Sequence, residues 1–381
     1  MIYIVFFLIS CFLIWLSEKS SSRYIGKLLA FIAILLPCIL AGMRADTIGT
    51  DLRVYVEPMY NAAKQSTSFS SYMDQRWYVI WRYMYVNKFE IGFTTLVYLI
   101  EKLGGSLGTV LFFIQALILA PIYLGLKRMK KSYPVYLGML VFYLLFYNTS
   151  LNMMRQWIAM SILFYGLSYL ITNEKKKYFI TIVVACLFHT SALMGVVIYF
   201  LYMYSQKQRE YIKIANFKLS GSLAPVKVFI YGCIVLLSLN VIAVLLRTFG
   251  LAKYAGYIQG NGSIYLMPNQ IILRLPIIIL LIIRWRRILT EDELTPFYGS
   301  MLVLDLLASQ LISINVYAFR IASFFSEYNM LSYSALVYAG NRKYRTNRYV
   351  TLLYVLAYMV YYWISYLSLI HISEPTRPRL I

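Results

Sequence analysis

Residues 103–126 read LGGSLGTVLFFIQALILAPIYLGL, a stretch without a charged side chain, and the chain continues directly into Lys127 and Arg128. A helix rises about 1.5 Å per residue, so roughly 20 apolar residues are enough to cross the hydrocarbon of a bilayer. The stretch therefore predicts a membrane-spanning helix. Because basic residues tend to stay on the cytoplasmic side, we expect its Lys127 end to face the cytoplasm.

Low-charge runs of the same kind follow one another along the whole chain. Hydrophobic residues make up 61% of the sequence and charged residues 13%, a balance that excludes a soluble globular protein. The runs are longer than the roughly ten-residue alternating strands of a membrane barrel. The sequence thus predicts an all-α fold, a polytopic transmembrane helical bundle. The further runs are 2–16, 28–43, 133–150, 156–173, 178–206, 228–246, 269–283, 297–316, 321–340 and 349–366.

The positive charge is distributed in a way that indicates membrane topology. A formal net charge of +21 in a soluble protein would suggest nucleic-acid binding, but most Lys and Arg residues lie in short clusters between the apolar runs. Such clusters mark cytoplasmic loops, so no nucleic-acid partner is expected. The clusters lie at 19–27, 127–131, 175–177, 207–218, 284–287 and 342–348.

All six clusters can face the cytoplasm if the run 178–206 enters and returns as two short helices, because Lys177 and Lys207 flank it. The turn of this re-entrant hairpin falls near residues 188–191. A single long span is the alternative, and it violates the charge rule once. Residues 91–103 fit a helix that lies on or dips into the membrane surface. The prediction is about ten spans, with the N-terminus and one long loop (44–90) outside.

We expect residues 1–366 to form a single integral membrane domain. Residues 367–377 read LSLIHISEPTR, which resembles the translation of a sequencing-library adapter. The tail 367–381 is therefore interpreted as non-native, so of the two histidines only His189 is considered as a candidate site residue.

The four cysteines lie in apolar segments without the spacing of a disulfide framework or a zinc site, so neither a metal nor a cofactor is expected.

Arg155 is the one charged residue between residues 133 and 173, and polar Asn152 and Gln156 lie beside it. A guanidinium in such a setting is costly unless it faces a polar cavity or a membrane surface. The pattern favours a functional site, and the alternative is an interfacial Arg that reaches the lipid headgroups.

His189 falls at the predicted hairpin turn, where a near-neutral imidazole could act as a general base. A packing or hydrogen-bonding role is the alternative.

Arg320 follows the run 297–316 at its outer end, and Glu327, seven residues later, is expected to line the same interior surface. Arg274 and Asp305 also interrupt apolar runs, and Asp305 is interpreted as a structural partner for a neighbouring helix.

The outer loop begins with alternating charges around a Gly49-Thr50 turn, where Arg44, Asp51 and Arg53 could hold an anionic group and a sugar hydroxyl. A solvated turn with surface ion pairs is the alternative. Aromatic residues follow in the same loop and are interpreted first as membrane-interface anchors, although they could stack on sugars. These are Trp77, Tyr78, Trp81, Tyr83 and Tyr85.

Several short motifs occur together in a fixed order between residues 43 and 340. Through them the chain resembles the EpsG family of exopolysaccharide proteins, relatives of Wzy-type (O-antigen and capsule) polysaccharide polymerases. One departure is Leu52, where an aromatic residue is more usual. The motifs are Arg44; Gly49-Thr50-Asp51 with Tyr55; Phe89-Glu90-Ile-Gly92-Phe; Asn152-x-x-Arg155-Gln156-x-x-Ala159; Phe188-His189-x-Ser191-Ala192; and Arg320 followed by aromatic residues.

The resemblance implies a multi-pass glycosyltransferase of the bacterial cytoplasmic membrane. Its substrate would be an oligosaccharide repeat unit on a polyprenyl diphosphate such as undecaprenyl diphosphate, joined into exopolysaccharide or capsule at the outer face. Membrane lipid and other assembly proteins, such as a flippase or a chain-length regulator, would be its partners. The inverting displacement expected of this class needs no metal or cofactor.

The resemblance also implies roles for individual residues. Negative charge develops on the leaving diphosphate, and arginines can stabilise it with paired donors. The candidates for this task are Arg44, Arg155 and Arg320, and further substrate contacts are expected from Arg53, Asn152 and Gln156. His189 is the first candidate for the base that activates the sugar hydroxyl, with Asp51 and Glu90 as reserves.

Three other functions remain open at this point. A transporter or flippase for lipid-linked sugars would also carry charged residues inside the membrane, although we see no internal repeat of the kind common in transporters. A ligase or acyltransferase that acts on surface glycans is a second possibility. The third is a non-catalytic subunit of a polysaccharide assembly complex.

Overall fold

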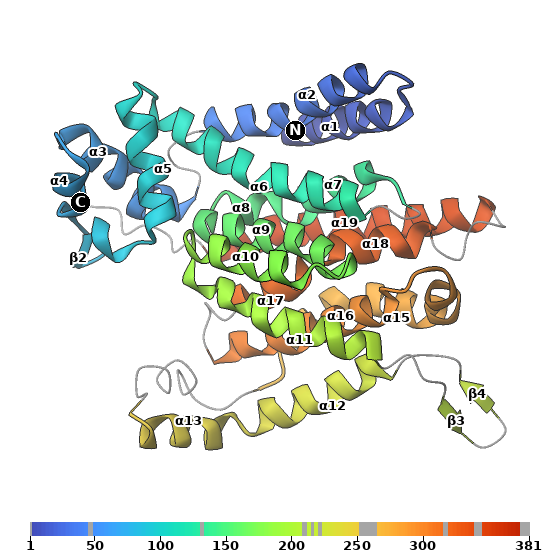
Figure 1. Cartoon of the computed structure of the whole chain (residues 1–381). Coiled ribbons are helices and arrows are strands. Elements are labelled where there is room, and N and C mark those ends of the chain that lie inside the picture. The colour runs from blue at the N-terminus through green and yellow to red at the C-terminus, as the bar shows by residue number, and fades with distance from the viewer. Residues whose placement is uncertain are drawn as a thin grey trace. The chain divides into compact units, whose positions relative to one another are not determined.

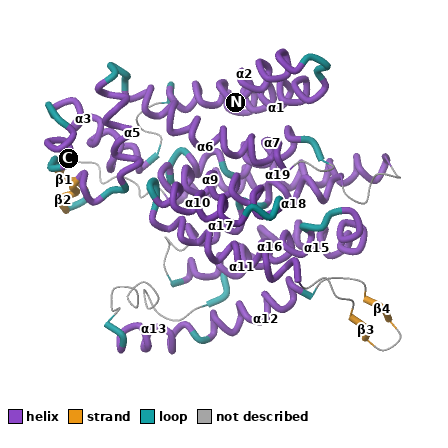
Figure 2. The backbone as a smooth tube through the Cα atoms, viewed as in Figure 1, coloured by secondary structure: helices purple, strands orange, loops and turns teal. Residues whose placement is uncertain are grey.

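The computed structural model describes residues 2–44, 49–129, 133–207, 212–214, 217–219, 223–250, 265–314, 319–338 and 345–373. Figures 1 and 2 show that helices dominate, with two short strand pairs. The chain divides into two compact units, residues 1–199 and 200–381. Each unit is described by itself.

The first unit is built on long apolar helices (Figure 1). Helix α1 packs against α2 and α7, and α6 packs against α2 and α9. Small residues allow the close approach of α2 and α6, because a Cβ atom on Gly42 would lie 2.8 Å from the carbonyl oxygen of Gly108. The helices are α1 (Ile2–Lys19), α2 (Arg23–Gly42), α6 (Leu107–Met129), α7 (Val135–Leu145), α8 (Tyr147–Ser150), α9 (Met154–Ile171) and α10 (Lys175–Cys186).

The predicted hairpin is present as two helices. Helix α10 ends at Cys186, a short 3-10 turn η3 (Thr190–Leu193) follows, and α11 (Met194–Lys207) begins at once. The Tyr178 hydroxyl donates to the Gly195 carbonyl oxygen at 2.7 Å, and the rings of Tyr178 and Tyr199 stack. These contacts join the start of α10 to the first turns of α11, so the chain reverses at η3.

The loop expected outside the membrane has a fold of its own. A small core of Ala62, Ala63, Tyr72 and Val86 holds its elements together. The loop contains a π-helix η1 (Leu52–Val56), helices α3 (Glu57–Gln65) and α4 (Phe69–Met73), an antiparallel pair β1 (Arg76–Val79) and β2 (Arg82–Tyr85), the turn η2 (Val86–Lys88) and then α5 (Ile91–Lys102). Arg76 is paired with Tyr85 in the strand register.

The second unit contains a buried ion pair. Arg274 Nε and Nη2 lie 2.9 and 3.0 Å from the two carboxylate oxygens of Asp305, and Arg274 also donates to the Gln270 side chain at 2.8 Å. Asp305 thus has the partner on a neighbouring helix that the sequence suggested. The elements are β3 (Ile212–Ile214), β4 (Phe217–Leu219), α12 (Ala224–Leu237), α13 (Leu239–Thr248), α15 (Pro268–Glu291), α16 (Thr295–Ser309), η4 (Gln310–Ser313), α17 (Phe319–Ser326), α18 (Asn329–Tyr338) and α19 (Arg345–Ser373).

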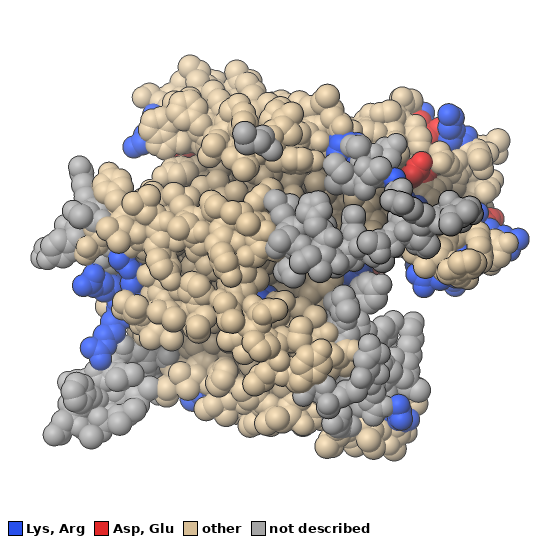
Figure 3. Space-filling view, turned by 180° about the vertical axis from the view of Figure 1, so that it is seen from behind, with Lys and Arg blue, Asp and Glu red and all other residues tan. Residues whose placement is uncertain are grey.

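Four helices of the described residues are long and apolar enough to cross a membrane: α1, α2, α6 and the stretch Thr295–Ser313. Uncharged side chains cover most of the surface in Figure 3, as a lipid-facing protein requires. The all-α membrane fold is thus confirmed, but the expected number of about ten spans is not. Several predicted runs break into shorter helices, at Phe146, at Ser238 and at Glu327.

Candidate functional site

Arg155 and Glu90 form an ion pair between two segments that are distant in the sequence. Arg155 is the second residue of α9, which starts after a break at Met153, and Glu90 precedes the first residue of α5. Arg155 Nη1 donates to Glu90 Oε2. Their side chains are 19% and 16% exposed, so the pair is only partly open to solvent. The ion pair therefore fixes the outer loop against the start of α9.

Aromatic rings surround the Arg155 guanidinium. Its central carbon lies 4.8 Å from the ring centre of Tyr55 and 4.7 Å from that of Phe89, a cation–π geometry. Trp77 stacks on Phe89 with ring centres 5.8 Å apart, and its indole nitrogen donates to the Val54 carbonyl oxygen at 2.8 Å. The rings and the carboxylate together hold the guanidinium in one orientation.

Glu90 also connects the loop to the turn of the α10–α11 hairpin. Its Oε1 accepts hydrogen bonds from the backbone nitrogen and the hydroxyl of Thr190, both at 3.1 Å. Beside it, the Gly92 backbone nitrogen donates to the Leu187 carbonyl oxygen at 2.8 Å. A Cβ atom on Gly92 would lie 2.7 Å from that oxygen, so only glycine permits this approach. One carboxylate thereby joins the residues around Arg155 to those around His189.

His189 is half-buried and begins the 3-10 turn η3 with an extended backbone. Its Nδ1 lies 3.2 Å from the backbone nitrogen of Ser191 and 2.6 Å from the Ser191 hydroxyl. The imidazole is therefore oriented by its own turn. It also lies close enough to Glu90 to influence the ionisation of that carboxylate.

Asn152 positions the start of the outer loop. Its Oδ1 accepts from the Thr50 hydroxyl at 2.9 Å and from the Asp51 backbone nitrogen at 3.2 Å. Asp51 Oδ2 in turn accepts from the Tyr55 hydroxyl at 2.6 Å. Gly49 adopts φ +95°, and a Cβ atom there would lie 2.9 Å from the Leu151 carbonyl oxygen. The Gly-Thr-Asp motif is thus fitted closely onto the residues that precede α9.

Arg44 is buried beside the same segment, with 8% of its surface exposed. Its Nη2 lies 3.4 Å from Sδ of Met154. Within the described residues, the Nε atoms of both Arg44 and Arg155 are buried and have no hydrogen-bond acceptor. Unsatisfied guanidinium donors of this kind are costly in a protein and suit an anionic ligand.

The other predicted site residues have different surroundings. Gln156 is buried, and its amide nitrogen lies 3.6 Å from Sδ of Met160. Arg53 is exposed on η1. Arg320 is half-buried on α17 in the second unit, and Glu327 is fully buried after the end of that helix. The structure thus brings together Arg44, Asp51, Glu90, Asn152, Arg155 and His189 within the first unit.

The electrostatics keep Glu90 ionised. Burial by itself would raise the pKa of Glu90, but Arg155, nearby backbone N–H groups and His189 outweigh burial and hold this pKa below its usual value. Tyr55 shows the opposite effect, since burial and the adjacent Asp51 raise the pKa of its hydroxyl. At neutral pH the site therefore contains the ionised carboxylate of Glu90, the guanidinium of Arg155 and the neutral phenol of Tyr55.

The sequence analysis named Glu90, Tyr55 and Phe89 but did not predict that they hold Arg155. Trp77 was expected to anchor the membrane interface, but it packs half-buried under Phe89 and bonds to Val54. Tyr78, Trp81 and Tyr83 of the same hairpin are 58%, 90% and 57% exposed, as interface anchors or sugar platforms would be. The signal in the sequence was the adjacent pair Phe89-Glu90, since an aromatic ring and a neighbouring carboxylate can together hold a guanidinium.

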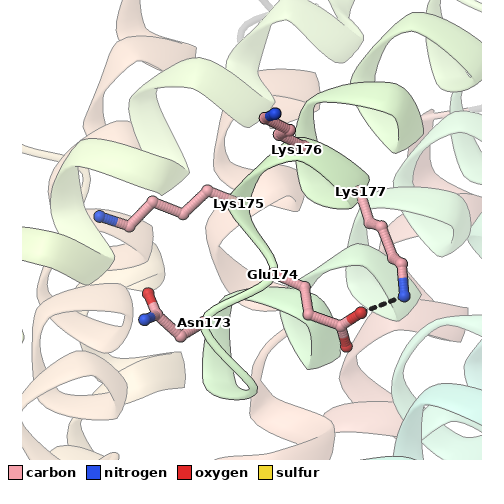
Figure 4. Close-up of a pocket in the computed structure, with 5 residues that line it drawn as sticks. All are labelled: Asn173, Glu174, Lys175, Lys176 and Lys177. Atoms are coloured by element: carbon pink, nitrogen blue, oxygen red, sulfur yellow. Dashed lines mark hydrogen bonds and ion pairs between the residues drawn. The ribbon is translucent and has the colours of Figure 1, made fainter.

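A basic cluster lies at the opposite end of α9. Figure 4 shows Lys175, Lys176 and Lys177 with Glu174, which pairs with Lys177 in a shallow pocket. Glu174 Oε1 also accepts from Arg128 at 2.9 Å, so the basic end of α6 lies beside the basic start of α10. Helix α9 has 18 residues. At a rise of about 1.5 Å per residue it separates Arg155 from this cluster by about 25 Å, close to the thickness of the hydrocarbon core.

A comparison with protein families identifies the chain over nearly its whole length. The model described as the EpsG family matches residues 27–374. This range includes every site residue described above. No curated protein and no solved structure matches the chain.

Proposed function

The chain belongs to the EpsG family, and from this premise we propose that it is a membrane glycosyltransferase that polymerises polysaccharide. Its substrates are oligosaccharide repeat units carried on a polyprenyl diphosphate, and the reaction takes place at the outer face of the cytoplasmic membrane. The observation that carries the proposal is the cluster of Arg155, Arg44 and Glu90. In it, two buried guanidinium Nε donors have no acceptor among the described residues.

The proposed reaction is a displacement at an anomeric carbon. The acceptor sugar hydroxyl attacks the first sugar of the lipid-linked chain, the bond from that carbon to the phosphate oxygen breaks, and the polyprenyl diphosphate departs with the electron pair. Charge grows on the departing oxygens, so fixed donors beside them lower the barrier. Arg155 and Arg44 are the donors that the first unit supplies. The role of Arg320 stays a prediction from the sequence.

The held orientation of Arg155 supports this role. Glu90 and the rings of Tyr55 and Phe89 fix the guanidinium before any ligand binds. A guanidinium that is already oriented does not have to reorganise as the transition state forms. Asn152 accepts a hydrogen bond from the Asp51 backbone nitrogen and so positions Asp51 near the Arg155 guanidinium.

The location of the site supports an outer-face reaction. Arg155 is the second residue of α9, whereas the basic residues 175–177 follow its last turn. Because clusters of Lys and Arg mark cytoplasmic loops, the Arg155 end of α9 is assigned to the outside. The loop with Asp51 and Glu90, which contacts Arg155, belongs to the same side.

The proposal is tested in cells that make the polymer, with wild-type protein and Arg155→Ala at equal membrane abundance. We expect the variant to lose long polymer and to accumulate single repeat units on the lipid carrier outside the membrane. Accumulation on the inner leaflet would indicate a flippase instead. Polymer of normal length and amount would contradict the proposal and favour a non-catalytic subunit. Lys64→Ala, which removes an exposed positive charge from α3 of the same loop, controls for the general loss of a positive charge.

A further inference from the structure

We propose that His189 acts in the transfer reaction as a hydrogen-bond donor through Nε2–H, and that Asp51 rather than His189 accepts the proton of the attacking hydroxyl. The inference rests on the proposed function, because it assigns roles within that reaction. It reverses the order of candidates that the sequence suggested. The reason is that a backbone N–H group of the protein itself donates a hydrogen bond to one of the two ring nitrogens, Nδ1.

The contacts at Nδ1 define the tautomer of His189. The Ser191 backbone nitrogen lies 3.2 Å from Nδ1. A backbone N–H can only donate, so Nδ1 must be the acceptor. In a neutral imidazole one nitrogen accepts and the other carries the proton, which places the proton on Nε2. The Ser191 hydroxyl, 2.6 Å from Nδ1, can donate to the same lone pair.

This tautomer is unsuited to a base and suited to a donor. A general base needs an unprotonated nitrogen directed at the hydroxyl, but here Nδ1 accepts from Ser191 and Nε2 carries a proton. An N–H group can instead donate to an oxygen that gains negative charge, as the leaving diphosphate does. His189 is joined to the arginine site through Thr190, which donates twice to the carboxylate that pairs with Arg155.

The two carboxylates differ in the contacts that protonation would break. Glu90 already accepts from Arg155 Nη1 and from the nitrogen and hydroxyl of Thr190. Taking up a proton would cost Glu90 its ion pair with Arg155. Asp51 is held by the neutral Tyr55 hydroxyl at 2.6 Å, and the Tyr55 ring lies against the Arg155 guanidinium. A proton taken up by Asp51 therefore leaves the ion pair of Arg155 with Glu90 in place.

In the proposed step the acceptor oxygen bonds to the anomeric carbon while the bond from that carbon to phosphate breaks. The hydroxyl proton moves to the Asp51 carboxylate, which later releases it to water. The electron pair leaves with the polyprenyl diphosphate, which the Nε2–H group of His189 and the guanidinium of Arg155 stabilise. Protons and charge are thus balanced without a further reactant.

Substitutions that mimic one ring nitrogen at a time separate the two roles. His189→Gln can place an amide N–H near the Nε2 position but cannot act as a base, whereas His189→Asn reaches only the Nδ1 position. We expect His189→Gln to retain polymer synthesis within about tenfold of wild type. His189→Asn and Asp51→Asn should each lose about a hundredfold or more. Equal losses in His189→Gln and His189→Asn would overturn the donor role, and an active Asp51→Asn would overturn the proton acceptor.

Arg155→Ala in the same assay distinguishes this inference from the proposed function. If Arg155→Ala makes normal polymer, the proposed function fails. If Arg155→Ala abolishes polymer but His189→Gln is as inactive as His189→Asn, only the role of His189 fails. Each variant is compared at equal membrane abundance, so that loss of folding is not read as loss of chemistry.

A spectroscopic measurement tests the tautomer without activity. The chain has two histidines, so His371→Gln leaves His189 as the one imidazole. The purified full-length variant, labelled with ¹⁵N in the histidine ring, is examined by NMR at neutral pH for the nitrogen that carries the proton. We expect the proton on Nε2. A proton on Nδ1 would contradict the inference, whatever the effect of the substitutions.

Discussion

Arg155 and Glu90 are 65 positions apart in the chain, yet the guanidinium of one is bonded to the carboxylate of the other. This single ion pair joins three segments, since Glu90 also binds Thr190 in the turn of the α10–α11 hairpin. Segments from three of the EpsG-type motifs, those that contain Glu90, Arg155 and His189, thus meet around one carboxylate. A site assembled in this way can be tested by changing one contact at a time.

Glu90→Gln removes the charge of this carboxylate while keeping an oxygen that can accept from Thr190. We expect a tenfold to hundredfold loss of polymer synthesis, because a hydrogen bond to a charged group contributes about 1.5–3 kcal/mol. Polymer length and lipid-linked repeat units are measured together at equal abundance. Wild-type output from Glu90→Gln would show that the ion pair does not orient Arg155 for the reaction.

The same carboxylate predicts a dependence of stability on pH. The pKa of Glu90 is held below its usual value in the folded protein. Its contribution to stability is therefore present above the unfolded-state pKa of about 4.3 and is lost as the pH falls through the lowered folded-state value. We expect wild type to lose thermal stability relative to Glu90→Gln over this acidic window. Parallel pH curves for the two proteins would contradict this.

Gly92→Ala tests the close approach of the loop to the hairpin turn. The added Cβ would lie 2.7 Å from the Leu187 carbonyl oxygen, so the backbones must separate and strain the bonds between Glu90 and Thr190. Overpacking of this kind costs about 1–3 kcal/mol. A lower melting temperature in detergent is expected, and Ser70→Ala on the exposed face of α4 should leave it unchanged. An unchanged melting temperature for Gly92→Ala would mean that the loop and the turn are not in contact.

Cysteine accessibility tests the assigned sides of the membrane. In a cysteine-free background, Lys64→Cys on the outer loop should react with an impermeant reagent applied to intact cells. Lys176→Cys, in the basic cluster beyond α9, should react only after the membrane is opened. Both lysines are exposed on the protein, so a difference reports on the membrane rather than on burial. The reverse pattern would overturn the topology.

The buried pair in the second unit makes a prediction about stability alone. Arg274→Ala leaves Asp305, which is 3% exposed, without its bidentate partner. Removal of one partner of a buried pair typically costs about 3–5 kcal/mol. The double variant Arg274→Met with Asp305→Leu should recover most of the lost melting temperature. A double variant as unstable as Arg274→Ala would indicate that the pair contributes more than mutual neutralisation.

Helices could be placed from the sequence because each is determined locally by an apolar run and by the charges at its ends. The break at residues 187–193 was one of two possibilities, because the flanking Lys177 and Lys207 favoured a return of the chain whereas the apolar length also allowed a single span. The number of spans was not predictable in the same way. Runs such as 133–150 and 321–340 are apolar over most of their length, yet their helices break at Phe146 and Glu327.

Site residues could be named from the sequence, but their contacts could not. The ion pair of Arg155 with Glu90 and the bond of Asn152 to the Asp51 backbone depend on how the outer loop folds onto α9. No periodicity or spacing reports such a pairing. His189 shows the same limit, because its tautomer depends on the geometry of one turn.

The most direct test of the central claim uses purified protein in lipid vesicles, supplied with a lipid-linked repeat unit. We expect wild type to form lipid-linked dimers and longer chains and to release one polyprenyl diphosphate for each bond made. Arg155→Lys, which keeps the charge but loses the planar pair of donors, should slow this release at least about tenfold. Wild-type vesicles that release no polyprenyl diphosphate and form no dimer, although the protein is folded and inserted, would contradict the proposed polymerase activity.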